Sequence, residues 1–193
     1  MRKLLFILLA VIALTGCGNN RNNGKTSSAE DMVENGKIGY ADIVSFLVQG
    51  FHCRWEGMSP EERGLSPVYS YNSPYAGYTI KDIDGNGIDE LLIGDMFENG
   101  DYFLYDIYTI NPKDGTIIHL ADGGERDRFK INGNGVIIEE GSNSAFDSFQ
   151  KGYSIVDGQL VGINGWNDSL LSLNLESFAG MAEQNNLDGT FGE

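Results

Sequence analysis

The apolar residues between positions 39 and 51 recur at helical spacing. The positions separated by intervals of three or four residues are Tyr40, Ile43, Val44, Leu47, Val48 and Phe51. This pattern predicts one amphipathic helix from Gly39 to Gly50, which the second glycine ends. Ser59 then precedes Pro60 and Glu62, an arrangement that predicts a short capped helical turn.

From residue 78 onward the pattern changes to short segments that are separated by turn residues. Eight segments have the length and composition of strands: Tyr78–Lys81, Glu90–Ile93, Tyr102–Ile110, Thr116–Leu120, Asp127–Ile131, Val136–Glu139, Gln150–Val156 and Gln159–Ile163. Glycine-containing turns lie between many of them, and Asp157-Gly158 is typical of a two-residue hairpin. We expect an antiparallel β-meander of short hairpins, in which each strand pairs with its neighbour in sequence.

A second helical pattern comes after the strands. Leu171, Leu175, Phe178 and Met181 are spaced for a small C-terminal helix between Leu170 and Gln184. An N-terminal helix, a run of hairpins and a small helix predict the α+β class. Residues 36–193 are long enough for one such domain and too short for two ordinary ones.

The first residues have the features of an export signal. Arg2 and Lys3 precede the apolar run Leu4 to Leu14, which is too short for a comfortable membrane span. The segment ends in Leu14-Thr15-Gly16-Cys17, which resembles the lipobox of bacterial lipoproteins. The resemblance implies that residues 1–16 are a signal peptide and that Cys17 is diacylated and becomes the mature N-terminus. It also implies a domain outside the cytoplasm, anchored by lipid to the cell membrane or outer membrane.

The segment after the signal is polar, and the chain as a whole is acidic. Residues 17–35 are predicted to be a flexible tether, because the polar stretch after Cys17 cannot bury enough surface to fold. The whole chain has a formal net charge of −15 at pH 7, and loss of Arg2 and Lys3 with the signal would lower it to −17. Such a surface repels nucleic acid, because affinity for nucleic acid depends on Lys and Arg. We therefore expect no nucleic-acid partner.

Oxygen-bearing side chains alternate in one loop between two predicted strands. Asp82, Asp84 and Asn86 occupy every second position. Ile88 can offer only its backbone carbonyl, and Glu90 comes two residues later. Hard oxygens at this spacing, wrapped tightly by glycine, suit a calcium ion with six to eight ligands.

The spacing resembles one known calcium loop and differs from another. An EF-hand would need a bidentate acid at the twelfth position, where Ile93 stands, and helices on both sides. Asp82–Glu90 instead resembles the calcium loop of FG-GAP and VCBS repeats, found in integrin-type propellers and many exported bacterial proteins. The resemblance implies that Asp89 points away from the ion and that the ligands are Asp82, Asp84, Asn86, the carbonyl of Ile88, and Glu90. The loop occurs once, which predicts one stabilised hairpin and not a repeat array.

The sequence lacks the catalytic motifs that spacing can reveal. No Gly-x-Ser-x-Gly elbow, dinucleotide fingerprint, phosphate loop or zinc spacing occurs. Of the two histidines, His52 adjoins Cys53 in an orientation unsuited to a dyad, and His119 is expected to be a packed or edge residue. Paired carboxylates of the glycosidase kind stay open, because their separation depends on the fold.

These features favour a calcium-stabilised binding or scaffolding module at the cell envelope, with no catalysis of its own. A secreted hydrolase or hydrolase inhibitor is the alternative, and a subunit of a larger envelope complex is a third hypothesis. The many Tyr and Trp residues suit core packing, or an exposed surface for a glycan or protein ligand. A deep cleft with two facing carboxylates would favour the hydrolase, whereas a flat exposed aromatic patch would favour the binding module.

Overall fold

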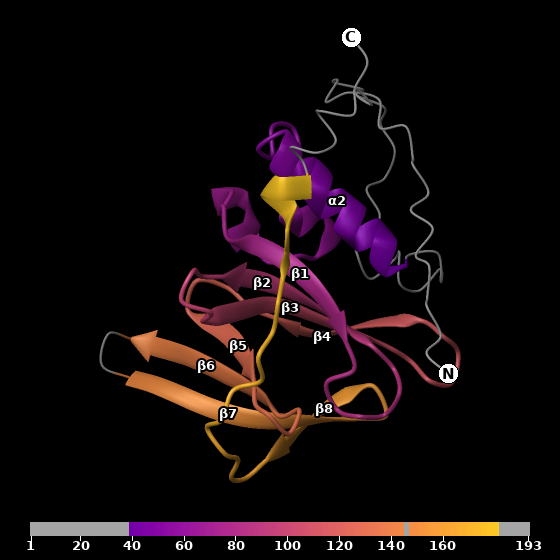
Figure 1. The fold of residues 1–193 in the computed structure, drawn as a ribbon, viewed down its shortest axis with the longest axis vertical. Coiled ribbons are helices and arrows are strands. Elements are labelled where there is room, and N and C mark those ends of the chain that lie inside the picture. The colour runs from indigo at the N-terminus through magenta and orange to yellow at the C-terminus, as the bar shows by residue number, and fades with distance from the viewer. Residues whose placement is uncertain (1–38, 145–146, 182–193) are drawn as a thin grey trace.

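The computed structural model describes residues 39–144 and 147–181. The predicted signal peptide, Cys17 and the tether over 17–35 lie outside the described residues. Within the described part of the chain, no helix is both long enough and apolar enough to cross a membrane. Most of this part is antiparallel sheet accompanied by few helices, which confirms the β portion of the α+β prediction (Figure 1).

The helices form a layer above one side of the sheet (Figure 1). The longest described helix, α2, spans Tyr40–His52, where the apolar spacing predicted one. The Asp42 carboxylate accepts a 2.7 Å hydrogen bond from the backbone N–H of Gly39, which caps the start of this helix. Two short 3₁₀ helices continue the layer, η1 over Pro60–Arg63 and η2 over Pro67–Tyr71.

The described residues form nine strands, close to the predicted ranges. They are β1 (Ala76–Lys81), β2 (Glu90–Met96), β3 (Tyr102–Ile110), β4 (Ile117–Asp122), β5 (Asp127–Ile131), β6 (Ile137–Ser144), β7 (Asp147–Val156), β8 (Gln159–Ile163) and β9 (Glu176–Ser177). The order in the sheet is β8-β7-β6-β5-β3-β2-β1-β9, and β4 also pairs with β3. Every pairing between these strands is antiparallel.

One pairing differs from the predicted meander. β5 pairs with β3, through Leu104 and Phe129, and not with its sequence neighbour β4. β4 pairs with the later part of β3, from Asp106 to Ile110. The prediction that each strand pairs with its neighbour is therefore wrong between β4 and β5. The physical reason is length, because β3 has nine residues and its edge accommodates two shorter strands.

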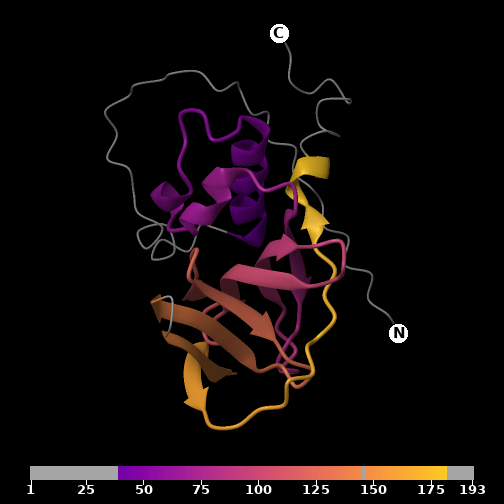
Figure 2. The same ribbon diagram turned by 90° about the vertical axis from the view of Figure 1, so that its left-hand side faces the viewer.

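The two faces of the sheet bury two separate clusters, and a β-bulge changes which residues of β3 point to each face. Leu104 and Asp106 pair with consecutive residues of β2, which leaves Tyr105 as the extra residue. Because side chains alternate along a strand, the bulge sends Leu104 and Tyr108 to opposite faces. We call these groups the strand cluster, which includes Leu92, Leu104, Ile107, Phe129 and Ile131, and the helical-layer cluster, which includes Leu47, Phe51, Tyr69, Leu91, Tyr108 and Phe178. Strands β1–β4 thus lie between the helices and strands β5–β8 (Figures 1 and 2).

The structure confirms a small C-terminal helix but places its start at Phe178, later than the predicted start at Leu170. Residues 171–175 form no helix, β9 comes next, and helical residues begin only at Phe178. Leu173 is buried in the strand cluster, whereas Phe178 is buried in the helical-layer cluster. The segment before Phe178 is therefore an extended chain, which runs along the side of the sheet toward the helices (Figure 1).

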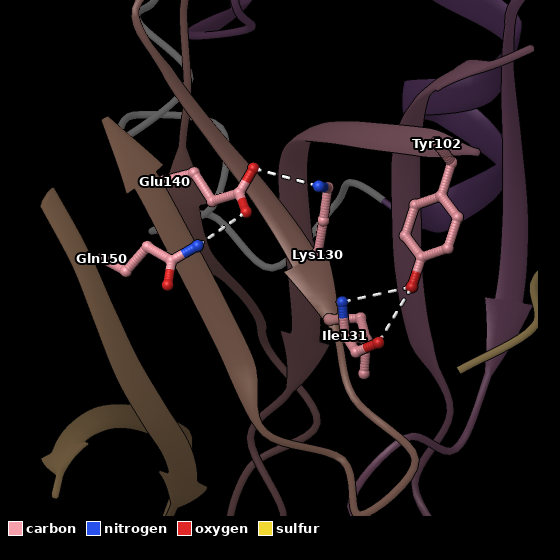
Figure 3. A network of polar contacts seen from close by, with 5 residues as sticks. All are labelled: Tyr102, Lys130, Ile131, Glu140 and Gln150. Atoms are coloured by element: carbon pink, nitrogen blue, oxygen red, sulfur yellow. Dashed lines mark hydrogen bonds and ion pairs between the residues drawn. The ribbon is translucent and has the colours of Figure 1, made fainter. Parts of the chain in front are cut away.

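Tyr102 joins β3 to β5 beside their single paired position. Its buried hydroxyl donates to the carbonyl oxygen of Ile131 at 3.0 Å and accepts from the N–H of Ile131 at 3.2 Å (Figure 3).

Tyr102→Phe should lower the free energy of unfolding by about 1–3 kcal/mol, because both buried backbone groups lose their partner. Urea unfolding measures this loss. Tyr153→Phe, whose hydroxyl binds the partly buried Glu139, is the control, and an equal loss in both variants would contradict the assignment.

Candidate metal centre

The loop between β1 and β2 is shaped by its own carboxylates and by two glycines. The Asp82 carboxylate accepts the N–H of Gly85 at 2.8 Å and the N–H of Gly87 at 2.9 Å. Asp84 Oδ1 accepts the N–H of Asn86 at 3.0 Å. Gly85 and Gly87 have φ of 78° and 86°, a left-handed conformation that glycine adopts without strain. The chain therefore turns sharply twice within the loop.

Three of the predicted ligands converge. Asp82, Asp84 and Glu90 each place one carboxylate oxygen within 4.8 Å of the other two. Asp89 is exposed and is not one of the three. The side-chain oxygen of Asn86 accepts the N–H of Ile88 at 2.6 Å, and its amide nitrogen donates to Asp84 at 2.9 Å. Ligation by Asn86 and by the carbonyl of Ile88 stays a prediction.

Glu90 is the buried member of this carboxylate cluster. Its side chain, at the start of β2, is fully buried. Its Oε2 accepts the N–H of Ile83 at 3.1 Å, and its Oε1 accepts the hydroxyl of Thr109 in β3 at 2.8 Å. Burial raises the pKa of Glu90 to about 7, and the neighbouring carboxylates of Asp84 and Asp82 add to the rise. A cation at this position would favour the ionised form.

The carboxylate cluster has no cationic partner among the ion pairs of the described residues. Those pairs join His119 with Asp106, Lys130 with Glu140, and Lys151 with Glu139. Lys81, which precedes the loop, directs its ammonium to the carbonyl oxygen of Ser172 at 3.5 Å. Ionised carboxylates this close repel one another, and a divalent cation relieves the repulsion. Three carboxylates are donors that suit a hard divalent cation.

A second turn packs against the back of the loop. Asn132 is fully buried, and its side-chain oxygen accepts the N–H groups of Asn134 and Val136, both at 2.9 Å. Gly135 in this turn has φ of 77°, and a Cβ there would lie 2.0 Å from the carbonyl oxygen of Ile83. The β5–β6 turn therefore fixes the backbone of the loop through a contact that only glycine permits.

Sequence reasoning missed the buried polar partners of the sheet. It gave no role to Thr109, which binds Glu90, or to Asp106. Asp106 is fully buried, lies 2.8 Å from Nε2 of His119 and accepts the N–H of Ser66 at 3.1 Å. His119 also stacks on Tyr108, with ring centroids 4.2 Å apart. The only signal in the sequence was a polar residue in an apolar strand. This signal does not identify the partners of the residue, because they depend on strand register.

Comparison with known proteins identifies no family. The chain matches no protein-family model, no curated protein and no solved structure. The resemblance to FG-GAP and VCBS loops therefore rests on residues Asp82–Glu90 alone. The metal hypothesis depends on the converging carboxylates and on the burial of Glu90.

The raised pKa of Glu90 should make the metal-free protein lose stability as the pH rises. Between its ordinary pKa of 4.5 and a folded-state value of about 7, the folded protein keeps a proton that the unfolded chain releases. The stability from this group is fully present below pH 4.5 and is lost as the pH rises through 7. In the presence of a chelator, we expect the deprotonation of Glu90 to lower the free energy of unfolding by on the order of 2–3 kcal/mol between pH 5 and pH 8.

Urea unfolding across this pH range measures the effect. Glu90→Gln should flatten the dependence, because the amide does not titrate. Asp89→Asn is the matched control, since Asp89 is exposed and lies outside the carboxylate cluster, and it should keep the slope. The same slope in Glu90→Gln as in the natural chain would contradict the assignment.

Proposed function

We propose that this protein is a bacterial cell-envelope lipoprotein whose domain is stabilised by one calcium ion in the β1–β2 loop. Its function is binding or scaffolding outside the cytoplasm, without catalysis of its own. Residues 1–16 are the signal peptide, Cys17 carries the lipid, and residues 17–35 tether the domain to the membrane. Two acyl chains on one residue suffice for stable anchoring, whereas a single chain does not.

The convergence of three carboxylates on a buried position is the observation that carries the metal assignment. Glu90 is fully buried, and Asp82 and Asp84 approach it from the loop. The proposed ligands are Asp82, Asp84, Asn86, the carbonyl of Ile88, and Glu90. All of them supply oxygen, the donor that calcium prefers and that zinc and copper sites mostly replace with nitrogen and sulfur.

A structural role for the ion fits the surroundings of the loop better than a regulatory role. Ile83 is buried in the strand cluster, and Glu90 is held by Thr109, so both ends of the loop are attached to the core. Extracellular calcium modules bind at about 10⁻⁴–10⁻³ M, where ambient calcium keeps them filled. An ion bound in this way stabilises the native state by mass action.

An aromatic and cationic surface supports the binding assignment. The rings of Tyr75, Phe97 and Phe103 follow one another, with centroids 5.4 Å and 5.8 Å apart. Arg128 of β5 places its guanidinium 4.0 Å from the centre of the Phe103 ring. Tyr75 is 42% exposed, and the two phenylalanines are partly exposed. Rings and a cation arranged this way suit contacts with a glycan or a protein.

A cavity beside β1 gives no such support to the hydrolase alternative. It has a volume of about 390 Å³ and lies between β1 and the part of the C-terminal segment from Ser172 to Glu176. Its lining holds one carboxylate, from Glu176, and one ammonium group, from Lys81. Glycosidase chemistry of the common kind needs two carboxyl groups that face each other across the scissile bond.

Calcium should raise the unfolding temperature of the domain. For a dissociation constant near 10⁻⁴ M, 10 mM calcium adds about 3 kcal/mol and shifts the midpoint by roughly 6–10 °C. Asp84→Ala should lose most of this shift, because it removes one of the converging carboxylates. Asp89→Ala should keep the shift, because Asp89 is exposed and lies outside the carboxylate cluster.

Thermal melts followed by circular dichroism, with calcium and then with chelator, measure both variants. A midpoint of the natural chain that does not move on chelation would sink the calcium proposal. A response lost in Asp89→Ala but kept in Asp84→Ala would place the ion elsewhere.

The lipid anchor predicts a different distribution for a Cys17 variant in a bacterial host. Cys17→Ala should move the protein from the membrane fraction to the soluble fraction, because the acylated thiol is lost. Cell fractionation and detergent phase separation measure the change. Cys53→Ala is the matched control and should stay in the membrane fraction. Retention of the Cys17→Ala protein on the membrane would contradict lipid attachment at this residue.

A further inference from the structure

Among the described strands, β8 is an open edge of the sheet. It pairs with β7 on one side, and it stands at the end of the strand order. Both views place it at the end of the molecule that is farthest from the helices (Figures 1 and 2). The pairing with β7 runs without a register shift from Gln159 to Ile163. Its outer backbone groups are therefore arranged regularly enough to pair with another strand.

The composition of β8 does not protect this edge. Its sequence, Gln159-Leu160-Val161-Gly162-Ile163, contains no charged residue and no proline, although the whole chain has a net charge of −15. Proteins commonly block edge strands with charges, proline or bulges, because an open edge invites pairing with another chain. An uncharged edge in such an acidic chain is a place where two copies can approach without direct repulsion.

The exposed face beside this edge is apolar. Val161 is 45% exposed, and Val156 on the neighbouring strand is 51% exposed. Their cross-strand partners, Ser154 and Gln159, place both valines on the same face of the β7–β8 ladder. Leu160 points the other way and packs against the strand cluster. Addition of a strand to β8 would therefore extend an apolar stripe on one face and the core on the other.

We propose that β8 pairs antiparallel with β8 of a second copy of this chain, about a two-fold axis at Val161. In this register Val161 faces its own counterpart, Leu160 lies opposite Gly162, and Gln159 lies opposite Ile163. The arrangement is self-complementary, because a large residue faces a small one at each inner position. Val156 and Val161 of one copy then form one continuous stripe with Val156 and Val161 of the other copy. Each copy contributes the same surface.

A disulfide tests both the partner and the register. The full chain carries Cys17→Ser and Cys53→Ser, so that an introduced thiol is the only one present. Val161→Cys should then form a covalent dimer under mild oxidation, because residues facing each other on antiparallel strands lie within reach of a disulfide. Non-reducing electrophoresis measures the linked fraction.

Gly162→Cys is the matched control. A Cβ at Gly162 meets no atom within 4 Å, so the variant is expected to fold. In the proposed register, residue 162 is displaced from its counterpart by two positions, about 7 Å along the strand and about 5 Å across it, which exceeds disulfide geometry. We expect roughly tenfold more linked dimer from Val161→Cys than from Gly162→Cys.

Sizing chromatography of the chain with Cys17→Ser, over a concentration series, gives an independent measurement. A second variant, Val161→Lys, should shift the population toward monomer, because two ammonium groups would meet at the axis. Equal linkage at positions 161 and 162, or linkage at 162 alone, would overturn the register. A monomer at every concentration together with an unlinked Val161→Cys variant would overturn self-pairing and leave the edge to a strand of another protein.

Discussion

The buried carboxylate of Glu90 is the constraint on which the hairpin and the sheet around it depend. A carboxylate removed from water costs several kcal/mol unless it is hydrogen-bonded or paired. The N–H of Ile83 and the hydroxyl of Thr109 offset part of that cost and, in doing so, join the loop to β3. A bound cation would offset the remainder. The fold at this point and the proposed chemistry of the loop therefore have the same origin, the placement of one acid in the core.

Asp106 is a second fully buried carboxylate in the same sheet, with a different set of neighbours. It is as fully buried as Glu90, yet His119 lies 2.8 Å away and the N–H of Ser66 donates to it at 3.1 Å. These partners come from β4 and from the residue before η2, so the contact ties the helical layer to the sheet. Glu90 instead has carboxylates, Asp82 and Asp84, as its charged neighbours. The convergence of three carboxylate oxygens around Glu90, and not burial as such, distinguishes the proposed cation site from the contact at Asp106.

Local features of the chain were predictable, whereas long-range ones were not. The strands could be predicted from alternation and turn residues, because both act within a few positions of the chain. The bulge at Tyr105 and the sharing of one edge of β3 depend on strands that are distant in sequence. Leu171 and Leu175 fitted the spacing of the helix that begins at Phe178, yet they lie in an extended segment whose path depends on burial of Leu173 in the strand cluster. At the site, alternating acids marked the loop, but the burial of Glu90 and its bond to Thr109 depend on the register between β2 and β3.

The position of β2 explains how an ion at one hairpin would act on the whole domain. Leu91 and Ile93 are buried in the helical-layer cluster, whereas Leu92 between them is buried in the strand cluster. The strand therefore serves both clusters, and Glu90 fixes where it begins. Loosening of the β1–β2 loop would free the end of a strand whose side chains are buried in both clusters. Local unfolding of one cluster would therefore also disturb the other, and its free-energy cost would be high. An ion that orders this loop should consequently stabilise a single cooperative unit, and the unfolding of the domain should remain one transition with the ion or without it.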